Sequence, residues 1–469
     1  MRVVVVGAGV AGLAAALEVR ALRPDADVVV LEGGHRVGGK VAVSEVAGLA
    51  VDEGADSMLT RVPDGLALAR AAGLEAELVA PAVGQASVWS RGVLRPLPAG
   101  TLLGLPTDLA ALADSQLLSP LGLLRVPLDL VLPGAPVEQD VSVGDLVRRR
   151  FGGEVVERLV DPLLGGVYAG RADLLSLQAT LPQLVAPVAR SRSLLLAARA
   201  ARAGTPPTDG PLFAGLPGGL GRLPAALAAA SGAQLRLGTT VRALERTPTG
   251  WRLTTGSAAA PSAEHADAVV LAVPGPPAAR LLADVVPAAA AEVAALEYAS
   301  VAIVTLVLGG PTPGRGSGYL VPAVDRRTTK AVTFTSRKWG HDPAGPSVVR
   351  ASVGRFGEHA DLQRPDAELV AAVLGELRQA VGPLPVVVGS RVVRWGGGLP
   401  QYAVGHVDRV RRVRSAVAAQ PGLAVAGAAY DGVGVPAVAR SGRDAARAAV
   451  ASALRQDGRH EQPGQRDPA

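Results

Sequence analysis

A glycine-rich turn between two apolar strands is the feature that most constrains the fold of this chain. Residues 3–6 are all valine, residues 7–12 read Gly-x-Gly-x-x-Gly, and a second apolar run over 28–31 ends at Glu32. In such a unit the glycines permit the tight turn, the approach of a pyrophosphate and close packing of helix on strand. The following helix offers free N–H groups, and Glu32 can accept hydrogen bonds from a ribose diol. The unit predicts a dinucleotide site on a parallel sheet, and by itself it fits NAD as well as FAD.

Composition excludes several classes of chemistry. Of the 469 residues 49% are apolar and only 3% aromatic, so we expect a core of Ala, Val and Leu. The absence of cysteine excludes disulfides, iron–sulfur ligation, thiolate catalysis and a cysteine-linked cofactor. The six histidines include no pair at metal-ligand spacing, so no metal site is expected. Because the first strand begins at residue 2 or 3 and no apolar run of about 18 residues occurs, we expect a cytoplasmic protein without a signal peptide or spanning helix.

The charge is net positive but carried almost wholly by arginine. The formal net charge is +6, and lysine occurs only at Lys40, Lys330 and Lys338. Scarce lysine with abundant Arg, Ala and Gly is typical of a GC-rich coding genome. A basic surface also favours an acidic substrate or an anionic lipid surface. The arginines are not interleaved with aromatic residues, so nucleic-acid binding is not expected.

Apolar runs like those at 3–6 and 28–31 recur far along the chain, over 267–274 and 423–427. We therefore predict an α/β protein whose Rossmann-like cofactor domain is discontinuous, with an inserted helical domain and an α+β substrate domain on a mixed or antiparallel sheet. Within the substrate domain, strands alternate with one helix over 366–381. In the helical domain, Ser142 is predicted to cap a helix that has Asp145 in its first turn. The predicted segments are 1–80, 210–285 and 395–455 (cofactor domain), 84–205 (helical domain), 286–394 (substrate domain) and 456–469 (disordered tail).

Two further segments suit a flat, phosphate-bearing cofactor. Directly after Glu32, residues 33–40 read Gly-Gly-His-Arg-Val-Gly-Gly-Lys, as in a loop folded against a pyrophosphate. Small residues at 54–57 follow, where a flat ring could lie on the backbone.

Together these segments resemble the flavin amine-oxidase superfamily, in which Glu-x₃-Arg-x-Gly-Gly follows the glycine turn and helps to hold FAD. Residues 161–170 (Asp-Pro-Leu-Leu-Gly-Gly-Val-Tyr-Ala-Gly) and 395–406 (Trp-Gly-Gly-Gly-Leu-Pro-Gln-Tyr-Ala-Val-Gly-His) resemble hallmarks of its protoporphyrinogen/coproporphyrinogen oxidase family. Residues 427–436 resemble the C-terminal flavin loop of that family. The resemblance runs in order from residue 1 to about 455 and is strongest to the actinobacterial coproporphyrinogen III oxidases.

The resemblance implies a set of FAD contacts. The start of the last helix would point at flavin N1 and O2, where reduced flavin carries negative charge that helix N–H groups stabilise. The implied contacts are Gly7, Ala8, Gly9, Val10, Ala11 and Gly12 at the pyrophosphate, Glu32 at the adenosine ribose with Gly33 next to it, Lys40 beside the phosphates, Gly54, Ala55, Asp56 and Ser57 against the isoalloxazine, Val241 at adenine, Trp395 near the flavin ring, and Val433, Gly434 and Val435 at the last helix.

The resemblance also implies a reaction. It is a six-electron oxidation of a porphyrinogen to a porphyrin in haem biosynthesis, in three steps that each pass a hydride to flavin N5. O₂ reoxidises the flavin and H₂O₂ is released. We expect coproporphyrinogen III as substrate, with its product passing to ferrochelatase, because four propionates suit a basic, roomy site. Protoporphyrinogen IX is the alternative.

No residue stands out as a general base, so the catalytic residues stay unknown. Candidate substrate contacts are Tyr168, Arg171, Arg95 and His406. Eukaryotic relatives carry an Arg on the strand before a Leu-Pro-x-Gly turn, where Ser87 aligns in this chain. The Leu-rich segment 116–133 is expected to line the core or a cavity, so membrane contact would be peripheral at most.

Two other classes stay open. An amine oxidase or carotenoid desaturase would keep FAD, but neither Lys330 nor Lys338 lies in a segment that matches the lysine near flavin N5 in amine oxidases, and a desaturase is not expected to contain the 395–406 segment. A non-enzymatic binder like the GDP-dissociation inhibitors shares the fold. The intact glycine turn, Glu32 and the C-terminal loop argue against this binder, because these parts hold FAD.

Overall fold

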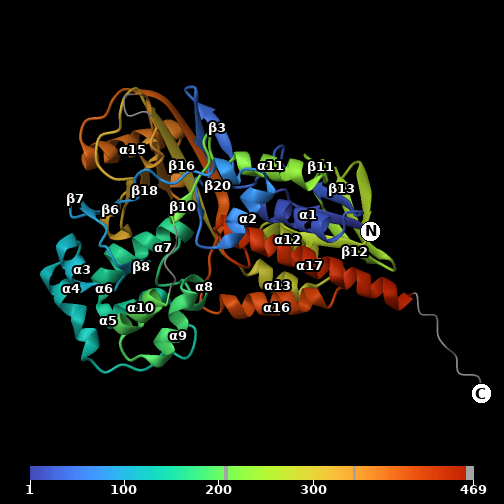
Figure 1. The fold of residues 1–469 in the computed structure, drawn as a ribbon, viewed down its shortest axis with the longest axis horizontal. Helices are drawn as coiled ribbons and strands as arrows, with labels where there is room; N and C mark the ends of the chain where they lie inside the picture. Colours follow the sequence, from blue (N-terminus) through green and yellow to red (C-terminus); the bar gives the residue numbers. More distant parts are fainter. Residues whose placement is uncertain (205–209, 342–344, 461–469) are drawn as a thin grey trace, which may run out of the picture.

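The structure is a computed structural model that describes residues 1–204, 210–341 and 345–460, without the side chains of 457–460. It has three parts (Figure 1): a parallel sheet with its helices near the N-terminus, a large second sheet beside α15, and a block of helices between α3 and α10.

The parallel sheet has five strands in the order β11-β2-β1-β15-β21. Every neighbouring pair is parallel, and the valines of β1 are at most 4% exposed. The strands come from all three segments predicted for the cofactor domain. Their bounds are β1 (Arg2–Val6), β2 (Asp27–Leu31), β11 (Gln234–Arg236), β15 (Ala268–Leu271) and β21 (Leu423–Val425).

Helices cover both faces of this sheet, which explains why its strands are continuous apolar runs. Side chains that alternate along each strand enter two different cores, one with α1 and α17 and one with α12, α13 and α16. The helices are α1 (Val10–Leu22), α11 (Arg222–Ser231), α12 (Gly275–Leu282), α13 (Pro287–Ala294), α16 (His406–Ala418) and α17 (Val435–His460).

Helix α17 continues beyond its predicted end near residue 455. It runs to His460 because no proline interrupts the chain before Pro463. The prediction of a disordered tail is therefore wrong for 456–460, and the rest of that tail lies outside the described residues.

Helices α1 and α17 cross very closely on one face of the parallel sheet (Figure 1). A Cβ atom built on Gly442 of α17 would lie 2.0 Å from the carbonyl oxygen of Ala11 in α1. Only glycine permits this approach, so the two ends of the chain depend on one another.

The second sheet has seven strands in the order β20-β16-β19-β18-β17-β6-β7. All neighbours are antiparallel except β17 and β6. Helix α15 (Asp366–Val381), at the predicted position, packs on one face. The strands are β6 (Ala86–Ser90), β7 (Val93–Pro96), β16 (Tyr298–Leu308), β17 (Gly318–Leu320), β18 (Thr329–Phe334), β19 (Ser347–Val353) and β20 (Val387–Pro400).

Three predicted boundaries differ from the structure. Strands β6 and β7 belong to the large sheet and not to the helical domain, because β6 pairs with β17, a strand from a distant part of the chain. The large sheet begins at β16 and not at residue 286, since α13 packs under the parallel sheet. It ends at Pro400 and not at residue 394, because β20 stays paired with β16 to that point.

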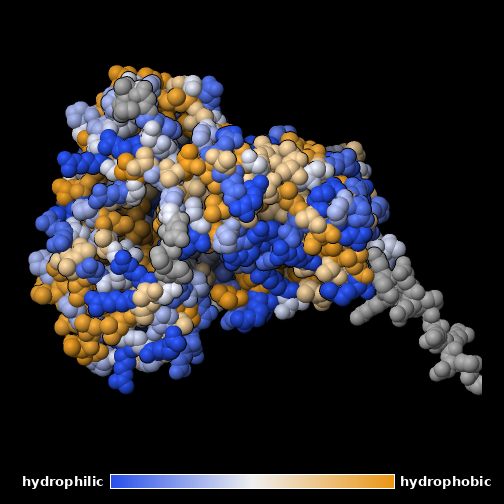
Figure 2. All heavy atoms as spheres, in the orientation of Figure 1, coloured by the Kyte–Doolittle hydropathy of each residue, from blue (hydrophilic) through white to orange (hydrophobic). Residues whose placement is uncertain are grey.

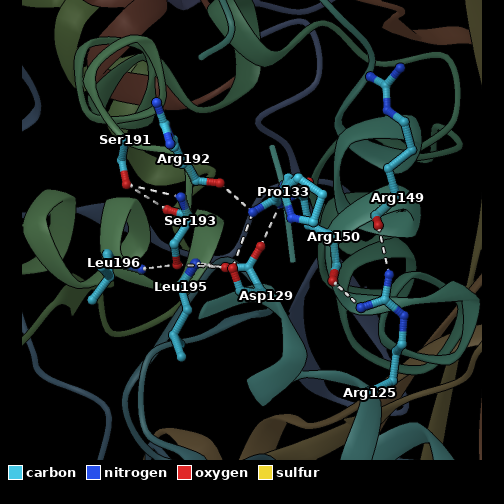
Figure 3. A network of polar contacts seen from close by, with 10 residues as sticks. All are labelled: Arg125, Asp129, Pro133, Arg149, Arg150, Ser191, Arg192, Ser193, Leu195 and Leu196. Atoms are coloured by element: carbon cyan, nitrogen blue, oxygen red, sulfur yellow. Dashed lines mark hydrogen bonds and ion pairs between the residues drawn. The ribbon is translucent and has the colours of Figure 1, made fainter. Parts of the chain in front are cut away.

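The helical block has its own apolar core and a buried polar network (Figure 3). Asp129, 1% exposed, accepts hydrogen bonds from Ser193 Oγ (2.6 Å) and the Leu195 N–H (2.9 Å) and pairs with Arg150. Ser142 caps α5 as predicted. The block contains α3 (Leu109–Ser115), α4 (Pro120–Arg125), η2 (Pro127–Leu130), α5 (Val143–Phe151), α6 (Gly153–Val155), η3 (Val156–Val160), α7 (Asp161–Tyr168), α8 (Leu177–Thr180), α9 (Pro182–Arg190) and α10 (Leu194–Ala203).

Smaller elements connect the three parts. They are β3 (Val43–Val46), β4 (Leu49–Asp52), β5 (Met58–Leu59), α2 (Pro63–Ala71), η1 (Glu75–Glu77), β8 (Thr101–Leu102), β9 (Leu105–Pro106), β10 (Phe213–Ala214), β12 (Ala243–Thr247), β13 (Gly250–Gly256), β14 (Pro261–Ala266), η4 (Ala323–Asp325), α14 (Thr335–Lys338) and η5 (Asp361–Gln363).

The same substitution is expected to act in opposite directions at two helical glycines. Gly442→Ala should lower the free energy of unfolding by about 2–3 kcal/mol, because its methyl group would meet backbone that cannot move aside. Gly375→Ala in α15, where an added Cβ meets nothing within 4 Å, should raise it by about 0.5–1 kcal/mol. Urea unfolding of both variants tests this, and equal effects would contradict the close crossing.

Candidate functional site

The candidate site lies at the carboxyl ends of the parallel strands, where open α/β sheets bind their ligands. Gly7 leaves β1 with φ +106°, and a Cβ there would lie 2.7 Å from the carbonyl oxygen of Ala272. Gly9 begins α1 without any side-chain cap, and a Cβ on it would meet nothing within 4 Å. The first N–H groups of α1 therefore face open space, which suits an anion.

The second glycine loop lies directly beside the first. The Gly38 N–H donates to the carbonyl oxygen of Ala8 at 2.8 Å, and Gly9 and Gly38 form an isolated parallel bridge. Gly38 and Gly39 both have positive φ, and a Cβ on Gly39 would lie 3.5 Å from the Cα atom of Gly9. The two loops thus form one cradle.

Glu32 links the two glycine loops that form this cradle. Its two carboxylate oxygens each accept a hydrogen bond at 2.7 Å, one from the Ala8 N–H and one from the Gly34 N–H. The Glu32 carbonyl oxygen accepts from the Thr239 N–H at 2.7 Å, which brings the neighbouring Val241 to the same end of the site. A carboxylate held in this way keeps lone pairs for a ribose diol.

Lys40, the 54–57 segment and Trp395 also come together. A Cβ on Gly54 would lie 1.9 Å from the carbonyl oxygen of Lys40, and the Trp395 indole donates to the carbonyl oxygen of Glu53 at 2.8 Å. Burial lowers the pKa of Lys40. Segments that lie far apart in the sequence thereby share one wall of the site.

The start of α17 completes the arrangement. The crossing with α1 sets Val435 and Val10 in one apolar cluster, so Val433, Gly434 and Val435 lie where the two helices begin. Gly427 N–H donates to Ser441 Oγ at 2.9 Å and ties the preceding loop to α17. Two helix N-termini with their partial positive charges therefore serve one site.

Two cations that the sequence did not predict, Lys338 and Arg350, adjoin this wall at the predicted Asp56. Asp56 pairs with Lys338 Nζ at 2.9 Å and with Arg350 Nη1 at 3.5 Å, and Arg350 also donates to the carbonyl oxygen of Gly54 at 2.5 Å. Burial acts to raise the pKa of Asp56, but Lys338 and Arg350 together lower it below its ordinary value. A pairing between such distant parts of the chain leaves no local signal in the sequence.

The two hallmark segments pack against each other. Gln401 Nε2 donates to the carbonyl oxygen of Tyr168 at 2.9 Å, and the rings of Tyr168 and Tyr402 lie 5.4 Å apart. Tyr402 also donates to the carbonyl oxygen of Ala428 in the C-terminal loop. Gly165 and Gly166 lie within α7.

The four candidate substrate residues do not form one cluster. His406, 5% exposed, stacks on Tyr402 at 4.3 Å, and burial lowers its pKa to about 4. Its Nε2 atom has no hydrogen-bond partner among the described residues. Arg95 lies on the edge strand β7 and donates to Gln116 at 2.6 Å, while Arg171 is exposed. No hydrogen bond or ring contact within the described residues joins either arginine to Tyr168.

The face of the large sheet opposite α15 is only partly covered, since Val307 and Val348 at one end of it pack against Val46 and Val51 of the β3–β4 hairpin. One cross-strand row, Val393–Ile303–Ser352–Ala331–Leu320, is only half-buried, whereas neighbouring side chains on the α15 face such as Val304 and Ala351 are completely buried. A Cβ on Gly166 of α7 would lie 3.4 Å from Leu320 Cδ2. The surface is hollowed between the large sheet and the helical block (Figure 2). This apolar face suits a flat, apolar ligand beside the cofactor cradle.

A further cavity of about 480 Å³ borders Gln401. Acidic and basic side chains line it, including Asp145, Arg149, Asp173 and Glu297. It adjoins the packed hallmark segments through Gln401.

Comparison with known proteins agrees with this geometry. The family of flavin containing amine oxidoreductases matches residues 10–450. A coproporphyrinogen III oxidase of Mycobacterium leprae (strain TN) is 37% identical, over 94% of this chain and 96% of that protein. One from Bacillus subtilis (strain 168) is 33% identical, over 96% and 97%.

Solved structures share the fold. A crystal structure from Exiguobacterium sp. 255-15, assigned provisionally as a protoporphyrinogen oxidase, is 35% identical, with a TM-score of 0.85 over 97% of this chain and 99% of that one. Cyclohexylamine oxidase from Brevibacterium oxydans IH-35A is 17% identical with a TM-score of 0.70, over 97% and 99%, which shows similarity of fold alone.

Asp52 is expected to make stability depend on pH. It accepts from the Gly221 N–H at 3.1 Å, and burial raises its pKa to about 6. Because the folded state binds this proton more tightly, its stabilising effect is present at low pH and is lost as pH rises from about 4 to 6, by about 3 kcal/mol. Asp52→Asn should remove this loss, as measured by urea unfolding at pH 4.5 and 7. Exposed Asp284→Asn is the control, and an unchanged slope in Asp52→Asn would contradict the assignment.

Proposed function

The chain belongs to the flavin containing amine oxidoreductase family, and on that premise we propose that it is an FAD-dependent oxidase that converts coproporphyrinogen III to coproporphyrin III in haem biosynthesis. Similarity over nearly the full length of relatives named coproporphyrinogen III oxidase carries this proposal. The packing of residues 161–170 on 395–406, beside the cofactor cradle, supports it.

The residues of the cradle fit FAD. The open N-terminus of α1 and the two hydrogen-bonded glycine loops would hold a pyrophosphate, and Glu32 would hold a ribose. Lys40 would add charge beside the phosphates, and Trp395 would keep residues 53–55 in place through its bond to Glu53. When bound, FAD supplies two-electron oxidation, so a six-electron reaction takes three rounds.

The chain's own part in the reaction is to hold and orient the substrate. The half-buried row from Val393 to Leu320 offers an apolar surface to a flat macrocycle, and Tyr168 stands at the end of α7 near that surface. No residue is assigned as a proton acceptor. His406 is buried behind Tyr402, so we expect it to position that ring and not to meet the substrate.

Oxygen is the proposed acceptor, with H₂O₂ as its product, and a ferrochelatase would consume the porphyrin. Protoporphyrinogen IX is the second candidate substrate, favoured by the 35% identical structure from Exiguobacterium. A two-substrate comparison separates these candidates.

Within the described residues no helix has both the length and the apolar character needed to cross a membrane. We propose that any membrane contact is peripheral and uses the exposed apolar side chains of α4, of η2 and of the two residues that follow η2. These are Leu121, Leu124, Leu128, Leu130, Val131 and Leu132. The expectation that this segment lines the core holds for Leu117, Leu118 and Val126, which are buried, and for Leu123, which packs against the same core.

The holoenzyme should oxidise coproporphyrinogen III faster than protoporphyrinogen IX. Each substrate is supplied separately in air, and porphyrin fluorescence is followed with H₂O₂ release. Faster turnover of protoporphyrinogen IX would overturn the choice of substrate, and purified protein without flavin absorbance would overturn the oxidase.

Glu32→Ala should weaken FAD binding at least tenfold, because it removes a carboxylate that joins both loops by charge-assisted hydrogen bonds. The flavin-to-protein ratio after dialysis against known FAD concentrations measures this. Glu77→Ala, which removes only an exposed ion pair with Arg222, is the matched control. Equal occupancy in both variants would contradict the role of Glu32.

A further inference from the structure

Strand β18 carries an irregularity that turns one lysine toward the open side of the large sheet. Thr329 pairs with Val353 and Ala331 with Ser352, so Lys330 is an extra residue in a β-bulge. Thr329 faces α15, where it bonds to Glu376, whereas Lys330 Nζ reaches the carbonyl oxygen of Gly165 in α7. Bulges near active sites commonly re-aim a side chain in this way.

Lys330 is a buried basic residue that has no anionic partner within the described part of the chain. It is 6% exposed, its hydrogen bond to the Gly165 carbonyl oxygen is long at 3.3 Å, and no ion pair joins its Nζ to a carboxylate of the described residues. A buried charge normally has a partner of opposite sign, because transfer out of water is costly. An anion bound beside Lys330 would therefore stabilise its charged form.

A second buried cation lies close by. Arg355, 8% exposed, donates to the carbonyl oxygens of Val321 at 3.1 Å and Thr329 at 3.3 Å. Its ion pair, with Glu358, is 3.5 Å long, and the Glu358 side chain is 59% exposed. The local charge is thus positive, and it adjoins the half-buried Ala331 and Leu320.

We propose that Lys330, with Arg355 behind it, is the anchor for one propionate carboxylate of the porphyrinogen. This inference rests on the proposed function and adds a substrate contact that is absent from the four candidates of the sequence. The exposed Gly166 and the half-buried Leu320 leave room for the macrocycle beside the ammonium group.

The charged and titratable groups around Lys330 define its pH behaviour. Burial, with the nearby Arg355, lowers the pKa of Lys330 to about 7. On α7, burial raises the pKa of Tyr168 to about 12 and also raises that of Asp161, which accepts from the Ala172 N–H. On the other face of the large sheet, Glu376 of α15 accepts a hydrogen bond from the Thr329 N–H. A carboxylate binds the protonated amine, so affinity should be constant below pH 7 and fall up to tenfold per pH unit above it.

A purely structural role predicts something different. Lys330 could serve only to neutralise the carboxyl end of α7, where Gly165 lies. Its removal would then lower thermal stability but would leave the pH dependence of ligand binding unchanged.

The test measures binding of coproporphyrin III to the flavin-loaded enzyme by porphyrin fluorescence between pH 6 and 9. Lys330→Gln should weaken binding about tenfold at pH 6.5 and abolish the decline above pH 7. Lys330→Arg should restore affinity and remain flat with pH, because an arginine does not titrate in this range. If Lys330→Gln does not fold, the pH dependence of coproporphyrin III binding by the wild type still tests the proposed anchor.

Arg411→Gln is the matched control, since it removes one positive charge from a side chain that is 71% exposed and that, among the described residues, forms an ion pair with Asp408 alone. Equal affinities for Lys330→Gln and Arg411→Gln, or a flat wild-type profile, would overturn the anchor and leave the oxidase intact. A wild type that neither binds coproporphyrin III nor oxidises its porphyrinogen would overturn both.

Discussion

The close crossing of α1 and α17 is the contact on which the site depends. Gly442 lets α17 approach the backbone of Ala11, and both helices pack on the same face of the parallel sheet. Their N-termini then open toward one place, although the two helices come from opposite ends of the chain. Two sets of unpaired N–H groups at one point create a field that favours an anionic cofactor. Without the crossing, only the N-terminus of α1 would face the site, and the N-terminus of α17 would not contribute to this field.

The large sheet is joined to this cradle by polar contacts and by one small apolar cluster, in which Val46 and Val51 meet Val307 and Val348. Arg350 and Lys338 reach Asp56, Trp395 reaches Glu53, and each lies on or beside the large sheet. Beyond these contacts the row from Val393 to Leu320 is only half-buried. The open row therefore adjoins the cofactor site, which is what a reaction between a flat substrate and a flavin needs.

Local patterns in the sequence predicted the local parts of this structure well. The strands β1 and β2, the helix Asp366–Val381 and the Ser142 cap follow from periodicity and capping chemistry that act over a few residues. Predicted domain boundaries were wrong where a strand pairs with a strand from a distant part of the chain. Nothing near β6 indicates that it pairs with β17, and nothing near Asp56 indicates Lys338. Arg95 and Arg171 lie close along the chain to segments that resemble the family. Closeness along the chain does not determine which face of the structure a side chain occupies.

The sequence by itself determined the cofactor class, because the two glycine loops act through backbone geometry that their own residues impose, and Glu32 acts through a carboxylate at a fixed distance along the chain. It also determined the family, through motifs that stand in order along the chain. Only the tertiary structure decided which side of the large sheet is open and which cations lie buried beside it. Burial and register depend on strands that meet from distant parts of the chain, so a lysine in a bulge looks like any other lysine until its neighbours are in place.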